Sequence, residues 1–350
     1  MNAKTFQFTK PRRASEAFTL AELLVSVFVL VIIIFMVAQL MNSAAAITRS
    51  GHKHISTDTQ ARAVFDRMAV DFAQMLERTD IDYYVKGPTN YNGHGNGHGW
   101  GRRRQTGQQG SDQLAFFSQV PGYYPSGSAS PISLVAYRIY EGASTDPAYL
   151  KLQRLGKGLL WNAVDNPTQQ PNHNNYTCPM VFLPVLISDR WPSAVDGSTA
   201  DNDGHYETIG PGVFRFEYYY LLKNGKLTDV PWDVLARPNQ TTLTKPQSIG
   251  LADVESITVA LAVVDSAGRN LITAASSTSL DDIASDMADF KTAPGRGFGG
   301  TKNIGDLEYS WQTSLLNIIS SGQTSSNTPV PPEAAKAIRI YSKTFDLKTL

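Results

Sequence analysis

The sequence lacks most features that would mark an enzyme or a nucleic-acid-binding protein. Lysine plus arginine and aspartate plus glutamate number 31 each, so no excess of positive charge predicts binding to nucleic acid. The single cysteine, Cys178, excludes an intramolecular disulfide and is interpreted as a small apolar side chain near a strand. No Gly-x-Ser-x-Gly, His-Glu-x-x-His or phosphate-binding lysine motif occurs. We therefore expect a protein without enzymatic activity.

Charged residues make up only 18% of the chain, and part of this deficit lies in one apolar block, Phe18 to Ala38. As a helix, this block would be ~32 Å long, enough to cross the core of a bilayer. The residues before it are polar and contain four basic side chains against one acidic side chain. Because positive charge is retained on the cytoplasmic side, we expect the N-terminus in the cytoplasm and the chain beyond about residue 40 outside it.

One carboxylate, Glu22, lies inside the apolar block. A charged side chain within a spanning helix costs ~2.5–3.5 kcal/mol on insertion scales, so such a residue usually marks a function. The simpler alternative is that Glu22, about one helical turn from the interface, extends its carboxylate to the aqueous side.

Basic residues precede the small residue Ala17, and the apolar block then begins Phe18-Thr19-Leu20-Ala21-Glu22-Leu23-Leu24-Val25. This pattern resembles the processing and N-methylation motif of type IV prepilins and type II secretion pseudopilins. The resemblance implies that prepilin peptidase cuts between Ala17 and Phe18 on the cytoplasmic side and methylates the new N-terminus. It also implies that Glu22, the fifth residue of the mature chain, pairs with the N-terminal amine of a neighbouring subunit and sets the register between subunits. The family usually has Gly before the cut, so Ala17 predicts slower cleavage.

Two alternatives assign the block differently. Ser43-Ala44-Ala45-Ala46 resembles the small-residue cleavage site of a secretory signal peptide, although the apolar run before it exceeds the usual core of about 7–15 residues. This alternative leaves Glu22 without a role. The block could also be a plain anchor that is never cleaved.

Residues 55–76 are predicted to continue the helix beyond the membrane, with one apolar stripe and one polar side. The apolar stripe comprises Ile55, Val64, Phe65, Met68, Phe72, Met75 and Leu76, and the polar side comprises Arg62, Asp66, Arg67, Asp71 and Gln74. No proline occurs between Arg12 and Gly87, and only Gly51 predicts a local loosening. The stripe is suited to packing against a sheet.

From residue 81 the pattern changes to the period-two alternation of strands. Strands are predicted at Gln113–Ser118, Ile132–Glu141, Tyr149–Leu155, Val181–Ser188, Val213–Leu222, Val254–Val264 and Ala337–Phe345. In Val213–Leu222, aromatic residues alternate with Arg215 and Glu217, which predicts antiparallel strands with one packed face. Asn224-Gly225 predicts a hairpin turn.

Two helices are predicted between the last two strands. One begins with the capping box Ser279-Leu280-Asp281-Asp282, and the other covers Tyr309–Ile319. The glycine-rich residues Gly295 to Gly300 between them predict a mobile surface loop.

Parts of this region resemble the J-type minor pseudopilins of type II secretion. The similar pieces are residues 135–139, 150–154, 212–219 with Trp232 following, and 251–257. Residues 338–345 are similar to the end of the prepilin-like C protein of the Verru_Chthon cassette. We therefore expect an α+β protein in which a long N-terminal helix packs on antiparallel sheet. Its expected parts are a leader (1–17), a transmembrane helix (18–40), an amphipathic continuation (41–80) and an extracytoplasmic β-rich domain (81–350).

Two groups of residues are candidates for metal binding. His94 and His98 are four apart but lie among glycines, which favours a surface loop. Asp201, Asp203 and Glu207 offer the carboxylate oxygens that calcium prefers, without the full spacing of an EF-hand. We expect no cofactor, and calcium is the one alternative.

The sequence thus predicts a minor pilin or pseudopilin, a structural subunit of a pilus-like or type II secretion filament. The expected partners are other pilin or pseudopilin subunits, prepilin peptidase and the inner membrane. The protein would cross that membrane once, with its C-terminal domain periplasmic or extracellular. The alternative function is a membrane-anchored extracytoplasmic binding module that does not polymerise.

Overall fold

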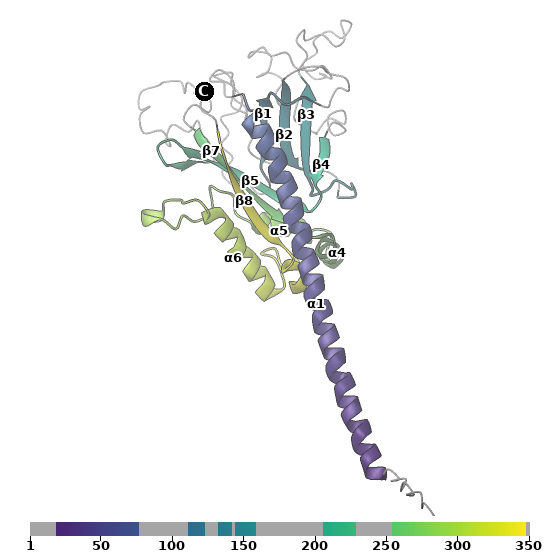
Figure 1. Cartoon of the computed structure of the whole chain (residues 1–350). Coiled ribbons are helices and arrows are strands. Elements are labelled where there is room, and N and C mark those ends of the chain that lie inside the picture. Colours follow the sequence, from purple (N-terminus) through teal and green to yellow (C-terminus); the bar gives the residue numbers. More distant parts are fainter. Residues whose placement is uncertain are drawn as a thin grey trace, which may run out of the picture. The chain divides into compact units, whose positions relative to one another are not determined.

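The computed structural model describes residues 19–76, 111–122, 132–141, 144–158, 206–228 and 254–347, except the side chains at 46–50, 52–54 and 115. These residues combine helices with two antiparallel sheets, which confirms the predicted α+β class (Figure 1). The predicted strand Val181–Ser188 lies outside the described residues.

Helix α1 spans Leu20–Ala73 and continues without interruption through Gly51. The chain divides into two units, residues 1–52 and 53–350, and the boundary lies within α1. In the second unit most of the predicted apolar stripe is buried, including Val64 and Phe72, whereas Ile55 is 62% exposed.

The predicted extension of this helix to Leu76 is wrong, because the residues after Ala73 bond to strand β1 (Gln113–Ser118) instead. The Leu76 amide donates to the carbonyl of Phe117 at 2.9 Å, and the Gln119 amide donates to the carbonyl of Gln74 at 2.9 Å. These bonds give backbone groups beyond the helix end their partners and cover the outer edge of β1.

The first sheet has the strand order β1-β2-β3-β4, with β2 at Ser133–Ile139, β3 at Leu152–Gly158 and β4 at Tyr206–Gly210. The predicted bounds of β1 are confirmed, and the prediction for β2 is confirmed over its central residues. The strand predicted at Tyr149–Leu155 begins later than expected, because Leu150 adopts a left-handed φ of 50° in the preceding turn. Strand β4 was not predicted.

The second sheet has the order β6-β5-β7-β8, with β5 at Val213–Leu222, β6 at Leu227–Thr228, β7 at Val254–Val263 and β8 at Arg339–Asp346. The predicted hairpin joins β5 to β6: Gly225 has a φ of 77°, and its amide donates to the carbonyl of Leu222 at 2.8 Å. Residues 53–73 of α1 lie against both sheets, since the Phe72 ring is 5.1 Å from Phe116 of β1 and 5.0 Å from Phe345 of β8.

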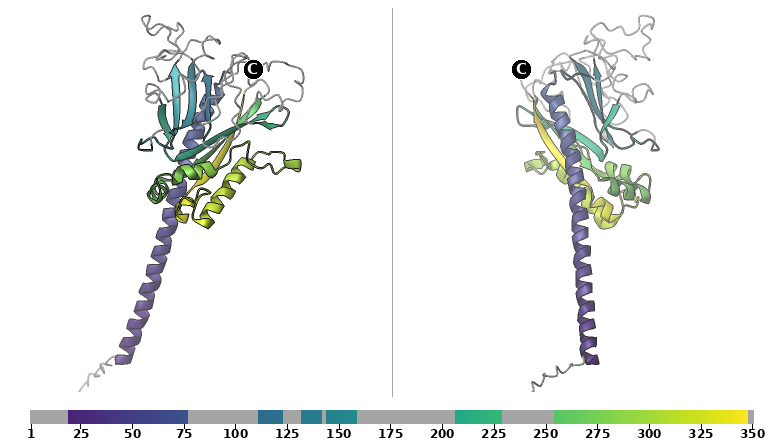
Figure 2. Two further views of the ribbon diagram at one scale, coloured as in Figure 1. Left: turned by 180° about the vertical axis from the view of Figure 1, so that it is seen from behind. Right: turned by 45° about the vertical axis from the view of Figure 1, so that its right-hand side comes forward.

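The prediction that these strands pack on one face only is wrong for β5. Arg215, Glu217 and Tyr219 are fully buried, like the aromatic residues that alternate with them. The second face is covered by residues 265–338, which leave the sheet after β7 and return to it at β8 (Figure 2). The charged residues of β5 therefore face this covering layer and not water.

This insertion contains α4 (Ser266–Ala275), α5 (Ser279–Asp286), the 3₁₀ turn η2 (Phe298–Gly300), α6 (Asp306–Ser321) and α7 (Pro332–Ala335). The helix predicted at Tyr309–Ile319 is confirmed within α6. The capping box at Ser279 is wrong, because its hydroxyl donates to the carbonyl of Pro329 at 2.9 Å. The unpredicted α4 has a side-chain cap: Oδ1 of Asp265 accepts from the amide of Gly268 at 3.0 Å.

Candidate functional site

Within the described residues, one helix is long and apolar enough to cross a membrane. It is the stretch Leu20–Ala45 of α1, and its side chains are exposed throughout rather than packed in a core. At ~1.5 Å per residue this stretch would be ~39 Å long, more than the ~30 Å core of a bilayer requires. Its length and composition are therefore compatible with a single-pass membrane protein.

The carboxylate of Glu22 forms a capping box at the start of this helix. Its Oε2 accepts from both the amide and the hydroxyl of Thr19 at 3.0 Å, and the Glu22 amide donates to the Thr19 hydroxyl oxygen at 3.3 Å. In such a box an N-cap Ser or Thr and a Glu three residues later satisfy each other's amides. Glu22 therefore has a structural role within its own chain.

The cap leaves part of the Glu22 carboxylate available. Both bonds from Thr19 reach Oε2, and no described residue donates to Oε1. The carboxylate lies near the positive end of the helix dipole, which favours its charged form. A cation from outside the chain could therefore bind Oε1 without breaking the cap.

A buried ionic cluster joins the other end of α1 to the first sheet. Arg154 of β3 donates from Nε to Oδ2 of Asp71 at 2.7 Å and from Nη2 to Oδ1 at 2.9 Å. The hydroxyl of Tyr137 donates to the same carboxylate. All three side chains are fully buried, so this bidentate pair is shielded from water and salt.

The protonation states in this cluster follow from burial and charge. Burial raises the pKa of Tyr137, and the charge of Asp71 raises it further, so the phenol keeps the proton that it donates. Burial alone would lower the pKa of Arg154, but its bonds to Asp71 raise the pKa above the ordinary value. Arg154 is thus a permanent buried cation whose main counter-ion is on α1.

Asp71 is a residue that sequence reasoning placed wrongly. The periodicity places it on the polar side of the helix, with Asp66 and Gln74, yet it is fully buried. Helical periodicity predicts the direction in which a side chain points from the helix axis. It does not predict how far the surface packed against the helix extends around it. Arg154, a cation in a predicted strand, is the available signal for a buried partner.

Three weaker contacts continue along the same part of α1. The amide of Gly212 donates to Oε1 of Gln60 at 2.8 Å. The hydroxyl of Tyr341 donates to the hydroxyl of Thr57 at 3.0 Å, and Lys343 lies 3.6 Å from Asp66. Together with the Asp71 cluster, these contacts hold residues 57–71 of the helix against both sheets.

A second buried ionic cluster holds the insertion on the second sheet. Arg215 donates from Nη2 to Oδ1 of Asp289 at 2.7 Å and to the carbonyl of Met287 at 3.1 Å. Oε1 of Glu217 accepts from the amide of Phe290 at 3.2 Å. The alternating charges of β5 are therefore the attachment points of residues 287–290.

Glu141, which follows β2 in the chain, has an altered pKa. Burial raises the pKa of its carboxyl to about 7, although the amide of Ser111 and the charge of Arg215 act in the opposite direction. About half of the Glu141 carboxyls are therefore protonated in the folded chain at pH 7, where an ordinary glutamate is ionised.

The predicted site residues are only partly covered by the structure. Ala17 and Phe18 lie outside the described residues, as do Asp201 and Asp203 and the histidines His94 and His98. Glu207 lies in β4, where its carboxylate is 3.7 Å from Nη1 of Arg154. Among the described residues, no group of three or more His, Cys, Asp or Glu is placed to hold a metal ion.

Comparison with models of known protein families gives no match, and no curated protein matches the chain.

Proposed function

We propose that the chain is a minor pilin or pseudopilin, a non-enzymatic subunit that assembles laterally with other pilin-like chains in or from the inner membrane. The observation that carries this proposal is the construction of α1. One uninterrupted helix begins with an apolar stretch that contains a lone carboxylate and ends in a half that is fixed to antiparallel sheets.

The two halves of α1 suit two different tasks. An apolar helix whose side chains are not buried by the described part of the chain can pack against lipid or against the same helix of another subunit. The second half is attached by a buried bidentate ion pair, so a load on the helix would be transmitted to the folded domain. A subunit held in a filament by its helix needs both properties.

The proposed role of Glu22 is to pair with a cationic N-terminus from a neighbouring chain. Prepilin peptidase would create that cation by cutting between Ala17 and Phe18. Each charge alone is costly in lipid, whereas the pair is tolerated, so the pair would specify one register between helices. The availability of Oε1 beside the Thr19 cap is compatible with this role.

Mass spectrometry of the membrane-extracted protein tests the processing step. A mature chain that begins at N-methylated Phe18 supports the proposal. A chain that begins at Ile47 would indicate an ordinary secreted protein, and an intact Met1 would indicate a static anchor, which favours the membrane-anchored binding module.

Substitutions at Glu22 test the assembly step, and the capping box dictates their design. Glu22→Gln removes the charge but retains a side chain that can cap Thr19, whereas Thr19→Ala removes the cap and retains the charge. We expect Glu22→Gln to reduce incorporation into filaments sheared from cells and Thr19→Ala to leave incorporation largely intact. The opposite result would show that Glu22 serves only to start the helix.

A further inference from the structure

A short basic segment of α1 follows the apolar stretch directly. We call it the basic band, and it consists of Arg49, His52, Lys53 and His54. Arg49 is the first charged residue after Glu22. The helix continues through the band without interruption, so Arg49 and Lys53, which are four residues apart, lie on one side of it. Two permanent positive charges thus follow the residues that are long and apolar enough to cross a membrane.

The spacing of the charges along α1 matches the thickness of a bilayer. A helix rises ~1.5 Å per residue, so Arg49 lies ~40 Å from Glu22 along the axis, and Lys53 comes about one turn later. A bilayer with its headgroup regions is ~40–45 Å thick. When Glu22 lies at the headgroups of one leaflet, the basic band therefore lies at the headgroups of the other.

The apolar stretch alone does not fix how deep the helix sits in the membrane. The stretch Leu20–Ala45 is ~39 Å long, whereas the hydrocarbon core is ~30 Å thick. The helix could therefore shift by several ångströms along its axis without exposing the core to polar side chains. Glu22 and Arg49 are the charged residues at the two ends, and each is costly within the core. They limit this shift and keep the band at the membrane surface.

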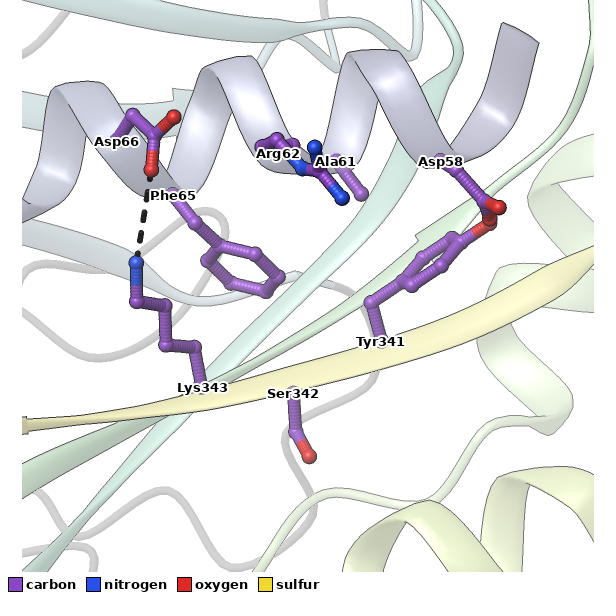
Figure 3. A pocket seen from close by; sticks show the side chains of 8 residues that line it. All are labelled: Asp58, Ala61, Arg62, Phe65, Asp66, Tyr341, Ser342 and Lys343. Carbon is purple, nitrogen blue, oxygen red and sulfur yellow. Dashed lines mark hydrogen bonds and ion pairs between the residues drawn. The ribbon is translucent and has the colours of Figure 1, made fainter. Parts of the chain in front are cut away.

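The carboxylates of the same helix do not account for the band. No acidic residue occurs between Glu22 and Asp58. Asp58 accepts a hydrogen bond from the hydroxyl of Tyr341, and the next acid, Asp66, lies 3.6 Å from Lys343. Figure 3 shows both carboxylates with these partners on β8. The positive charge of the band therefore exceeds the negative charge that its own helix offers.

Most of the span before the band, and half of the band itself, lie outside the folded domain. The compact unit that contains both sheets begins at Lys53, so Arg49 and His52 belong to the same unit as the apolar stretch. A basic segment between a membrane span and a folded domain has the lipid headgroups as its nearest anionic surface.

We propose that the basic band binds the phosphate groups of anionic phospholipids at the surface where α1 leaves the membrane. Guanidinium and ammonium groups form charge-assisted hydrogen bonds with phosphate oxygens. Near an anionic lipid surface, each Lys or Arg strengthens binding by a factor of about five. The inference rests on the part of the proposed function that places α1 across a membrane, and it does not depend on cleavage or on filament assembly.

The test uses the full-length chain in vesicles of phosphatidylcholine with a smaller share of phosphatidylglycerol, at a pH of about 8, where histidine is neutral. Cys178→Ser removes the natural thiol. Ala45→Cys carries a fluorophore one turn before Arg49, at an exposed position. Bromine on the acyl chains of one lipid or the other quenches the fluorophore, so the ratio of the two quenching efficiencies measures the local lipid composition. We expect phosphatidylglycerol to be enriched around the label about fivefold or more.

Charge variants assign the enrichment to the band. Arg49→Gln combined with Lys53→Gln should abolish it, whereas Arg49→Lys combined with Lys53→Arg should retain it. The matched control is Arg62→Gln combined with Lys343→Gln, which removes two cations of the folded domain, at the groove in Figure 3. Arg62 lies ~14 Å beyond Lys53 along the helix, more than the Debye length of ~10 Å at 0.1 M salt, so the control should retain the enrichment.

Salt gives a second readout of the same contact. Raising the salt concentration from 0.1 to 1 M shortens the Debye length from ~10 to ~3 Å, so the enrichment should fall steeply in the unsubstituted band. The variant with two glutamines should show no salt dependence. The thermal midpoint of each variant in the same vesicles shows whether a lost enrichment comes from unfolding of the domain.

Three results would overturn the proposal: equal quenching by the two brominated lipids, an enrichment that the two glutamines leave intact, or an equal loss in the matched control. Alkaline carbonate extraction separates this failure from that of the proposed function. A chain that stays in the membrane without the enrichment rejects only the lipid contact, whereas a chain that carbonate removes rejects the span and the proposed function with it. An intact Met1 end on a chain that shows the enrichment rejects only the pilin assignment.

Discussion

Replacing Asp71 by alanine would leave the guanidinium of Arg154 charged, fully buried and without its bidentate partner. Removing one member of a buried ion pair costs about 3–5 kcal/mol, and the hydroxyl of Tyr137 loses its acceptor for ~1 kcal/mol more. The half-exposed Glu207, 3.7 Å from Nη1, offsets part of this loss. We therefore expect the free energy of unfolding to fall by about 3 kcal/mol, a factor of more than ~100 in the folding equilibrium.

Pulse proteolysis of the detergent-solubilised full chain across a urea series measures this change. Asp66→Ala is the matched control, because Asp66 lies on the same helix with a side chain that is 66% exposed and pairs with Lys343 at 3.6 Å. An exposed pair contributes ~0–1 kcal/mol, so the control should lose less than about 1 kcal/mol.

A double-mutant cycle separates the pair from general damage to the core. Asp71→Leu combined with Arg154→Met removes both charges, and such replacements are often neutral. The double variant should therefore be more stable than either single variant. The reasoning is refuted if Asp71→Ala costs less than about 1 kcal/mol, or if the two single losses simply add.

Three further predictions concern other parts of the structure. The pKa of Glu141 is about 7 in the folded chain, whereas its ordinary value is 4.5. The free energy of unfolding should therefore fall as the pH rises from about 4.5 to about 7. Glu141→Gln should remove this dependence and stabilise the chain at pH 8 by up to ~3 kcal/mol in urea unfolding. Gly212→Ala would place a Cβ 2.5 Å from two oxygen atoms and should cost ~1–3 kcal/mol, whereas Gly51→Ala meets nothing within 4 Å and should raise thermal stability slightly. Asp289→Ala leaves Arg215 buried without its closest carboxylate, so limited proteolysis should cut the insertion first, and an unchanged cleavage pattern would contradict this attachment.

Local patterns in the sequence predicted the parts of the fold that depend on neighbours in the chain. The bounds of β1 and β5 are as predicted, because their alternation and the Asn224-Gly225 turn are complete within short segments. The motif around Glu22 is equally local, and it led to the proposed assembly role.

Predictions failed where the outcome depends on a distant segment. Arg215 in a period-two strand looks the same whether it faces water or a covering layer, and here that layer begins only at residue 265. Asp71 is buried because it pairs with Arg154, which lies in a strand more than eighty residues later in the chain. The local sequence predicts that the hydroxyl of Ser279 caps its own helix, but this hydroxyl donates to the carbonyl of Pro329. These pairings join distant segments, so the hydrophobic periodicity of a single segment does not predict them.

The strands β7 and β8 are neighbours in space, with Val263 opposite Arg339, although the whole insertion separates them in the chain. Closing a long loop costs only ~0.6 kcal/mol more for each doubling of its length, so the sheet tolerates an insertion of this size at this point. During folding, the local helices of the insertion can form before β8 joins the sheet, and β8 would dock late. Any segment inserted at this point would have to bring a carboxylate for Arg215 and an apolar cover for Tyr219, as Asp289 and Phe290 do here.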